Sequence, residues 1–302
     1  MNDNKHPLSD CTICPRTCHV NRLAGEMGYC RTGAGIVLAR AALHMWEEPC
    51  ISGERGSGTV FFSGCSLGCV YCQNEKIAKN HIGKEVTIER LVEIYFELKS
   101  QGAANINLVT PTHMLYAVIR SITVAKQQGF DLPFVYNCGG YEKAESLRLL
   151  DGLIDVYLTD FKYYDNTLAR RYSNAPNYAS YAGESLQEMV RQTGEAIFNE
   201  ENMMTKGVIV RHLVLPGCVQ DSKRIVKYLY HTYKDQIYIS LMNQYTPLPH
   251  VADYPEINRK VTEAEYDEVV EYAIELGVEN GFIQEGETAN ESFIPDFDIT
   301  GV

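Results

Sequence analysis

From residue 58 onward the sequence alternates between short apolar runs and amphipathic helical stretches. Six runs rich in β-branched and aromatic residues recur, at 59–64, 105–110, 133–138, 154–160, 207–215 and 237–245. After the first run, Leu91, Ile94, Tyr95 and Leu98 follow the spacing of one helix face. Strands that alternate with helices predict an α/β domain with a parallel sheet covered on both faces. An open sheet and a complete or partial barrel both fit, and both place ligand groups at the C-terminal strand ends.

Seven of the ten cysteines lie in two groups within the first 72 residues. The N-terminal stretch lacks the apolar core of a signal peptide, and no run approaches the roughly 20 apolar residues of a membrane span. We therefore expect a cytoplasmic protein whose cysteines are metal ligands or reactive thiols. The formal charge of −12 disfavours nucleic acid and anionic membranes as partners.

The stretch GCSLGCVYCQN, at 64–74, places Cys65, Cys69 and Cys72 directly after the first predicted strand. A four-iron cube normally takes four thiolates. Three close thiolates would hold three irons and leave the fourth open to a ligand from outside the protein. Gly64 and Gly68 allow the loop to wrap closely around a bulky cluster. The alternatives are a zinc site completed by a distant ligand, and structural thiols.

The segment CSLGCVYC resembles the C-x3-C-x-aromatic-C signature of radical S-adenosylmethionine (SAM) enzymes, with Tyr71 at the aromatic position. The resemblance implies a partial (β/α)6 barrel of the TIM type and a [4Fe-4S] cluster on Cys65, Cys69 and Cys72. It also implies that the amino and carboxylate groups of SAM chelate the fourth iron. Reductive cleavage of SAM then yields a 5′-deoxyadenosyl radical that removes hydrogen from a substrate.

The ends of the predicted strands carry polar groups that this resemblance assigns to the SAM pocket. The residues that we expect to bind the cofactor are Tyr71, Thr110, Thr112, Asn137, Asp160, Lys162, Arg211 and Gln244. Asp160 and Lys162 are two positions apart, so their side chains point the same way from an extended chain. The pair resembles the D-x-K element of pyruvate formate-lyase activating enzymes, which serves the SAM carboxylate and ribose. A surface ion pair is the structural alternative.

The fifth strand resembles the R-x-x-x-x-P-G strand of the same enzymes through Arg211, Pro216 and Gly217. A cation inside a strand needs an anionic partner. His212, the next residue, should face the opposite side of the sheet and pack there. At the end of the sixth strand, Gln244 is the expected ribose contact.

The N-terminal group comprises Cys11, Cys14, Cys18 and Cys30, with the spacing C-x2-C-x3-C-x11-C. Four thiolates make a closed site, which is structural or electron-transferring rather than catalytic. Zinc and a second [4Fe-4S] cluster both fit this donor set, and free redox thiols are the remaining alternative.

Across nearly the whole chain, segments such as CPRTCHVNRLAGEMGYC and DVYLTDFKYYD resemble uncharacterised iron–sulfur proteins related to pyruvate formate-lyase activating enzyme. We expect a cysteine-rich extension with little periodicity at 1–57, a radical SAM core at 58–280 and an acidic tail at 281–302. The resemblance implies an oxidoreductase similar to the activating enzyme. Reduced flavodoxin or ferredoxin would donate electrons, and a protein or peptide, a glycyl-radical enzyme included, is a candidate substrate. The alternative is a non-catalytic electron-transfer or metal-binding protein.

Overall fold

The computed structural model describes residues 6–80, 82–284 and 295–302. Its strands are β1 (Ile36–His44), β2 (Ser57–Phe62), β3 (Lys84–Val86), β4 (Ile106–Val109), β5 (Phe134–Cys138), β6 (Val156–Asp160), β7 (Ile197–Phe198), β8 (Met204–Leu213), β9 (Tyr238–Met242) and β10 (Gly281–Ile283). Its α-helices are α1 (Pro49–Ser52), α2 (Glu75–Ala78), α3 (Ile88–Ser100), α4 (Leu115–Gln127), α5 (Ala144–Leu147), α6 (Asn166–Ser173), α7 (Tyr178–Thr193), α8 (Val219–Tyr233) and α9 (Glu263–Leu276).

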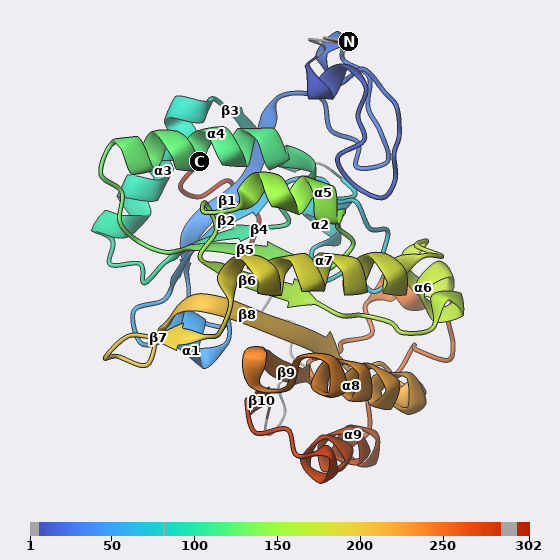
Figure 1. Cartoon of the computed structure of the whole chain (residues 1–302). Coiled ribbons are helices and arrows are strands. Elements are labelled where there is room, and N and C mark those ends of the chain that lie inside the picture. The colour runs from blue at the N-terminus through green and yellow to red at the C-terminus, as the bar shows by residue number, and fades with distance from the viewer. Residues whose placement is uncertain (1–5, 81, 285–294) are drawn as a thin grey trace.

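A mostly parallel sheet runs through the molecule, and the longer helices lie along one side of it (Figure 1). The strand order is β10-β9-β8-β6-β5-β4-β2-β1-β3, with β7 paired to β8. All neighbours from β2 to β10 in this order are parallel, whereas β1 is antiparallel to both β2 and β3. The six predicted strands are confirmed as β2, β4, β5, β6, β8 and β9. The predicted fold class, a partial α/β barrel, is therefore confirmed.

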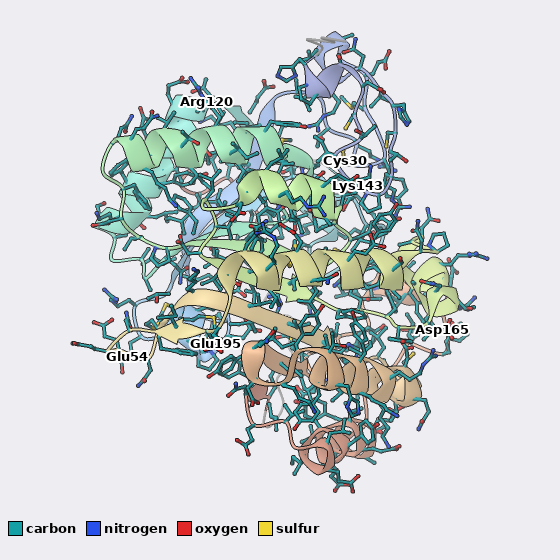
Figure 2. The ribbon with its side chains drawn as sticks, viewed as in Figure 1. Cys30, Glu54, Arg120, Lys143, Asp165 and Glu195 are labelled. Carbon is teal, nitrogen blue, oxygen red and sulfur yellow. The ribbon has the colours of Figure 1, made fainter. Side chains whose placement is uncertain are left out.

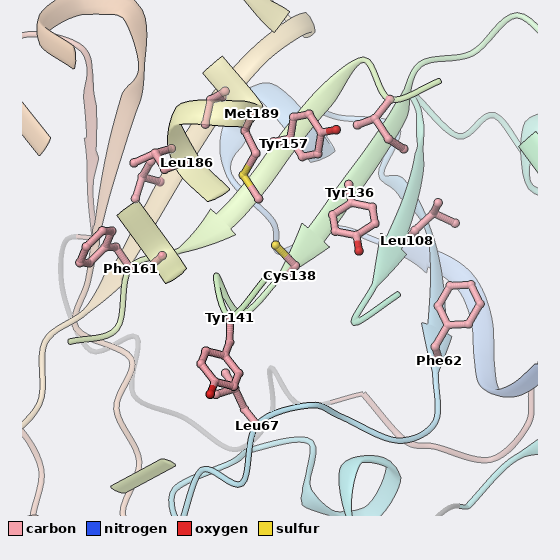
Figure 3. Close-up of a cluster of buried hydrophobic side chains, with 14 of the residues drawn as sticks. Phe62, Leu67, Leu108, Tyr136, Cys138, Tyr141, Tyr157, Phe161, Leu186 and Met189 are labelled. Carbon is pink, nitrogen blue, oxygen red and sulfur yellow. The ribbon is translucent and has the colours of Figure 1, made fainter. Parts of the chain in front are cut away.

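The outer face of the sheet is apolar because helices cover it. Tyr136 and Cys138 of β5 and Tyr157 of β6 lie on this face, opposite Leu186 and Met189 of α7 (Figure 3). All five side chains are buried. Each fully buried Leu or Met side chain contributes about 1.5–3 kcal/mol relative to an exposed one. Packing against the helices therefore explains the nearly continuous apolar character of the strands.

The inner face of the sheet is divided between apolar and polar side chains. Toward the N-terminal strand ends, Ile51 of α1 packs in one cluster with Val135, Val156, Leu158 and Ile209. Toward the C-terminal ends, polar side chains take the corresponding positions on the same face, since side chains alternate with a period of two along each strand. The short helix α1 thus closes the barrel at the N-terminal ends of the strands, and the polar side chains lie at the opposite end of the barrel.

β1 lies in the stretch for which the sequence showed little periodicity. Its residues Leu38 and Ala39 are fully buried, so it is an integral strand of the sheet. The described C-terminal residues 295–302 lie along β1, where Asp298 and Arg40 form an ion pair of 2.8 Å. Residues 285–294 of the predicted tail lie outside the described residues, and the two boundaries between the three domains stay predictions. Of the helices in the described part of the chain, none has the length and apolar character needed to cross a bilayer.

Candidate functional site

The three cysteines of the motif lie on the loop between β2 and α2, at the C-terminal edge of the parallel sheet. Gly64 opens this loop with a φ of +95°, a left-handed conformation that favours glycine. A Cβ atom at Gly64 would lie 2.8 Å from the carbonyl oxygen of Cys30, so no side chain fits there without a shift of the backbone. On its far side the loop is held by Val70, whose N–H donates to the carbonyl of Tyr172 at 2.8 Å.

The thiols of Cys65, Cys69 and Cys72 influence one another electrostatically. Burial raises the pKa of Cys65, and the charges of Cys69 and Cys72 raise it further. Burial, followed by the charge of Cys69, raises the pKa of Cys72 to about 12. The thiolates of Cys65 and Cys72 therefore need nearby positive charge to stay ionised. The iron ions of a cluster would supply that charge, so the donor set fits an iron–sulfur cluster.

Arg211 of β8 is the centre of a buried polar network on the inner face. Its Nε donates to Asp160 Oδ1 at 2.9 Å, and one terminal nitrogen donates to Asn137 Oδ1 at 2.7 Å. The other terminal nitrogen lies 3.1 Å from Glu47 Oε2. Parallel register places Asp160 beside Arg211, which explains why neighbouring strands bring the two side chains together. The network holds the guanidinium in a single orientation.

Lys162 joins this network to the cysteine loop. Its Nζ lies 2.6 Å from Asp160 Oδ2. Burial would raise the pKa of Asp160, but Lys162 and Arg211 outweigh burial and hold it below its usual value. Burial would lower the pKa of Lys162, but Asp160 and then Cys69 raise it. A charged ammonium is therefore held beside the cysteine loop, at the edge of the sheet where the sequence predicted a ligand.

Sequence reasoning missed two carboxyl groups in this network, those of Glu47 and Glu48. They follow β1 and precede α1, which inserts them into the inner face. Burial raises the pKa of Glu47, against the opposing effects of Arg211 and Asn107. Burial likewise raises the pKa of Glu48 to about 7, against the effect of Arg211. The only sequence signal was a pair of acids ahead of a proline, which does not reveal that they point inward.

Four of the eight expected cofactor residues lie outside this network. The Thr112 hydroxyl donates to Glu142 Oε1 at 2.5 Å. Thr110 has a φ of +59°, and its N–H donates to the backbone carbonyl of Asn137. The Tyr71 hydroxyl pairs with that of Tyr163 at 2.6 Å. The side-chain nitrogen of Gln244 lies 3.5 Å from Met242 Sδ, and the backbone carbonyl of Gln244 accepts a hydrogen bond from the Gln73 side chain. The structure thus unites Asn137, Asp160, Lys162 and Arg211, and gives the other four different partners.

The N-terminal cysteines precede β1, and the carbonyl of Cys30, which Figure 2 labels, lies close to Gly64 of the three-cysteine loop. Burial raises the pKa of Cys14 to about 12, and Cys30 and Cys18 add to the effect. The guanidinium of Arg16 stacks 3.7 Å from the centroid of the Tyr29 ring, and its Nε donates to the Ser66 carbonyl at 2.8 Å. Arg16 therefore ties the two cysteine loops together.

Throughout the described ranges, no three or more His, Cys, Asp or Glu side chains converge on a position for one metal ion. Metal binding at Cys11, Cys14, Cys18 and Cys30 accordingly stays a prediction from their spacing and chemistry.

Two comparisons of the sequence find similar proteins. The family model described as the radical SAM superfamily matches residues 59–193, which include the three-cysteine loop and the Asp160–Lys162 pair. An uncharacterized protein of Methanocaldococcus jannaschii is 29% identical over 278 residues, which is 89% of this chain and 75% of that protein.

Two solved structures share the fold. SuiB of Streptococcus suis, in a structure bound to S-adenosylmethionine, aligns with a TM-score of 0.50 and 12% identity, over 74% of this chain and 49% of its own. This chain therefore spans about half of SuiB. Methylornithine synthase (PylB) aligns with a TM-score of 0.50 and 13% identity, over 78% of this chain and 68% of its own. Residues 59–193 are thus similar to the radical SAM superfamily, and the chain shares its fold with these two solved structures.

Proposed function

We propose that the chain is a radical SAM enzyme that holds a [4Fe-4S] cluster on Cys65, Cys69 and Cys72 and binds SAM at the fourth iron. When bound, the reduced cluster and SAM supply a 5′-deoxyadenosyl radical, which removes a hydrogen atom from a substrate. The observation that carries this proposal is the position of the three-thiol loop beside Lys162, at the C-terminal edge of the parallel sheet.

The ion network defines what the chain itself contributes to SAM binding. In this proposal the Lys162 ammonium faces the SAM carboxylate, because charge-assisted hydrogen bonds of this kind are short and strong. Asp160 keeps Lys162 charged and oriented through their contact of 2.6 Å. Arg211 holds Asp160 in place and is itself held by Asn137 and Glu47. The pocket is thus arranged before the cofactor arrives, which lowers the ordering cost of binding.

The other four expected residues complete the proposed pocket. Thr110 and Gln244 lie at the ends of β4 and β9, where they would contact the amino group and the ribose. Tyr71 and Thr112 would support the pocket without a hydroxyl contact to SAM, since the hydroxyl of each is hydrogen-bonded to another buried side chain.

The N-terminal cysteines are proposed to hold either zinc or a second [4Fe-4S] cluster. Supporting this, the loop around them is tightly bonded: the Tyr29 N–H donates to Cys18 Sγ at 3.3 Å, and Cys30 Sγ lies 3.0 Å from Thr32 Oγ1. Metal analysis of a variant with alanine at Cys65, Cys69 and Cys72 separates the two metals. About four residual irons per chain support the second cluster, whereas one zinc without iron excludes it.

The substrate proposal rests on the resemblance to activating enzymes. The D-x-K and R-x-x-x-x-P-G elements favour an activase-like oxidoreductase that acts on a protein or peptide, a glycyl-radical enzyme included. Reduced flavodoxin or ferredoxin would supply the electron, and the cytoplasm, which keeps thiols reduced, is the proposed compartment.

SAM cleavage provides the test. The protein is reconstituted anaerobically with iron and sulfide, reduced with dithionite and mixed with SAM, and 5′-deoxyadenosine is measured by chromatography. We expect product from the wild type and none above background from Cys69→Ala. The competing function, an electron-transfer or metal-binding protein, predicts a bound cluster in the wild type with product at the Cys69→Ala level.

A further inference from the structure

A chain of three buried hydroxyl groups ends on one of the three cluster cysteines. Ser173 Oγ lies 3.0 Å from Cys69 Sγ. The Tyr163 hydroxyl lies 2.7 Å from Ser173 Oγ, and the Tyr71 hydroxyl lies 2.6 Å from that of Tyr163. All four residues are buried, with exposures of 0% for Ser173, 1% for Tyr163, 6% for Tyr71 and 9% for Cys69. Water therefore has little access to compete for these hydrogen bonds.

The protons of this chain can be assigned from the chemistry of its end. A cysteine sulfur that binds iron is a thiolate, so Cys69 Sγ can only accept. Ser173 must then donate its single hydroxyl proton to the sulfur. Tyr163 consequently donates to Ser173, and Tyr71 donates to Tyr163. The three hydroxyl groups point head to tail toward the sulfur, and each bond in such a chain polarises the next.

Cys69 differs from the other two cysteines in the source of its hydrogen bond. Cys65 Sγ accepts from the backbone N–H of Leu67 at 3.3 Å. Cys72 is influenced by a backbone hydrogen bond at Asn74. Cys69 Sγ accepts from the side chain of Ser173, so a substitution at Ser173 removes this hydrogen bond without a change in the backbone of the cysteine loop. Ser173 is also well anchored, because its carbonyl accepts from Gly68 of the same loop.

We propose that Ser173, Tyr163 and Tyr71 are positioning residues that set the reduction potential of the cluster held by Cys65, Cys69 and Cys72. The physical reason is that a hydrogen bond to a cluster sulfur stabilises negative charge, and reduction adds one negative charge. The hydroxyl chain therefore makes the cluster easier to reduce. This inference rests on the proposed function, since it requires a cluster on these cysteines.

The test measures the midpoint potential of the full-length, reconstituted protein without SAM, by redox titration monitored with electron paramagnetic resonance. The signal that disappears in Cys69→Ala identifies the cluster in question. We expect a shift to more negative potential in Ser173→Ala, a smaller shift in Tyr163→Phe and the smallest in Tyr71→Phe. The matched controls are Ser121→Ala and Tyr95→Phe, which break a buried Tyr–Ser hydroxyl pair of 2.9 Å between α3 and α4, and should leave the potential unchanged.

The possible failures can be told apart. If the wild type holds no cluster that depends on Cys69, the proposed function itself is wrong. If the cluster forms and Ser173→Ala has the same potential as Ser121→Ala, the hydroxyl-chain proposal is wrong. If Ser173→Ala cannot hold the cluster, Tyr163→Phe decides, because it retains Ser173. A negative shift then supports the proposal, and an unchanged potential overturns it.

Discussion

Arg211 and His212 are neighbours on β8, yet they meet opposite environments. Arg211 points to the inner face, where Asp160 and Glu47 provide negative charge, and its pKa is raised despite burial. His212 points to the outer face, where its Nδ1 lies 2.8 Å from the Phe161 carbonyl and its Nε2 lies 2.8 Å from the Ser222 hydroxyl. Because a carbonyl only accepts, Nδ1 carries the proton. Burial lowers the pKa of His212 to about 4, so the ring is neutral.

The difference shows what each face of the sheet is built to do. A buried charge is tolerated only where partners offset the loss of water. On the outer face, which helices such as α7 cover (Figure 3), His212 is a neutral hydrogen-bonded member of the core. The inner face keeps an ion network that can meet a charged cofactor. The following three predictions probe this contrast, from the largest expected effect to the smallest.

Arg211→Met should produce the largest loss of stability. Removal of the guanidinium takes one cation from Asp160 and Glu47, whose side chains are largely buried, and breaking a buried ion pair costs about 3–5 kcal/mol. The free energy of unfolding, from urea titrations at neutral pH, measures the loss. Arg55→Met is the matched control, because the Arg55–Glu201 pair is exposed and should contribute about 0–1 kcal/mol. Equal losses in the two variants would mean that the inner network adds no stability.

His212 should make the protein less stable as the pH falls from about 6.5 to about 4. In this window the unfolded histidine binds a proton and the folded one does not. Protonation therefore stabilises the unfolded state and lowers the free energy of unfolding. The expected loss is about 1.4 kcal/mol per pH unit, up to roughly 3 kcal/mol. His212→Gln, compared with the exposed His231→Gln, should flatten the pH dependence of urea unfolding. An unchanged slope would show that the folded His212 is protonated near its ordinary pKa.

Lys162→Met should weaken SAM binding more than it weakens the fold. Loss of one charge-assisted hydrogen bond of about 1.5–3 kcal/mol corresponds to roughly a 10- to 100-fold higher Kd. Calorimetric titration of the reconstituted protein with SAM measures the change. Lys126→Met is the control, since Lys126 donates only to the carbonyls of Gly152 and Leu153 on the exposed surface. If Lys162→Met and Lys126→Met bound SAM with equal affinity, Lys162 would not be part of the SAM pocket.

Local sequence patterns were sufficient for the features that depend on one stretch of chain. The six core strands were predictable because apolar runs of strand length recur between helical patterns. The opposite orientations of Arg211 and His212, and the pairing of Asp160 with Lys162, follow from the period of two along an extended chain. β1 was missed because its partners, β2 and β3, also determine which of its side chains are buried.

The site shows the same division. The spacing of Cys65, Cys69 and Cys72 is written in eight consecutive residues, and so is the chemistry expected of them. The residues that surround them come from distant segments. Glu47 reaches Arg211 across 164 positions, and Ser173 reaches Cys69 across 104.

The sequence by itself determined the alternating α/β architecture, the three-thiol loop and the opposite orientations of Arg211 and His212, because all of these depend on short-range periodicity and spacing. Only the tertiary structure decided which carboxylates enter the barrel and which hydroxyl groups reach Cys69. Those contacts depend on how strands and helices from separate parts of the chain pack together, and no local pattern encodes the distance between them.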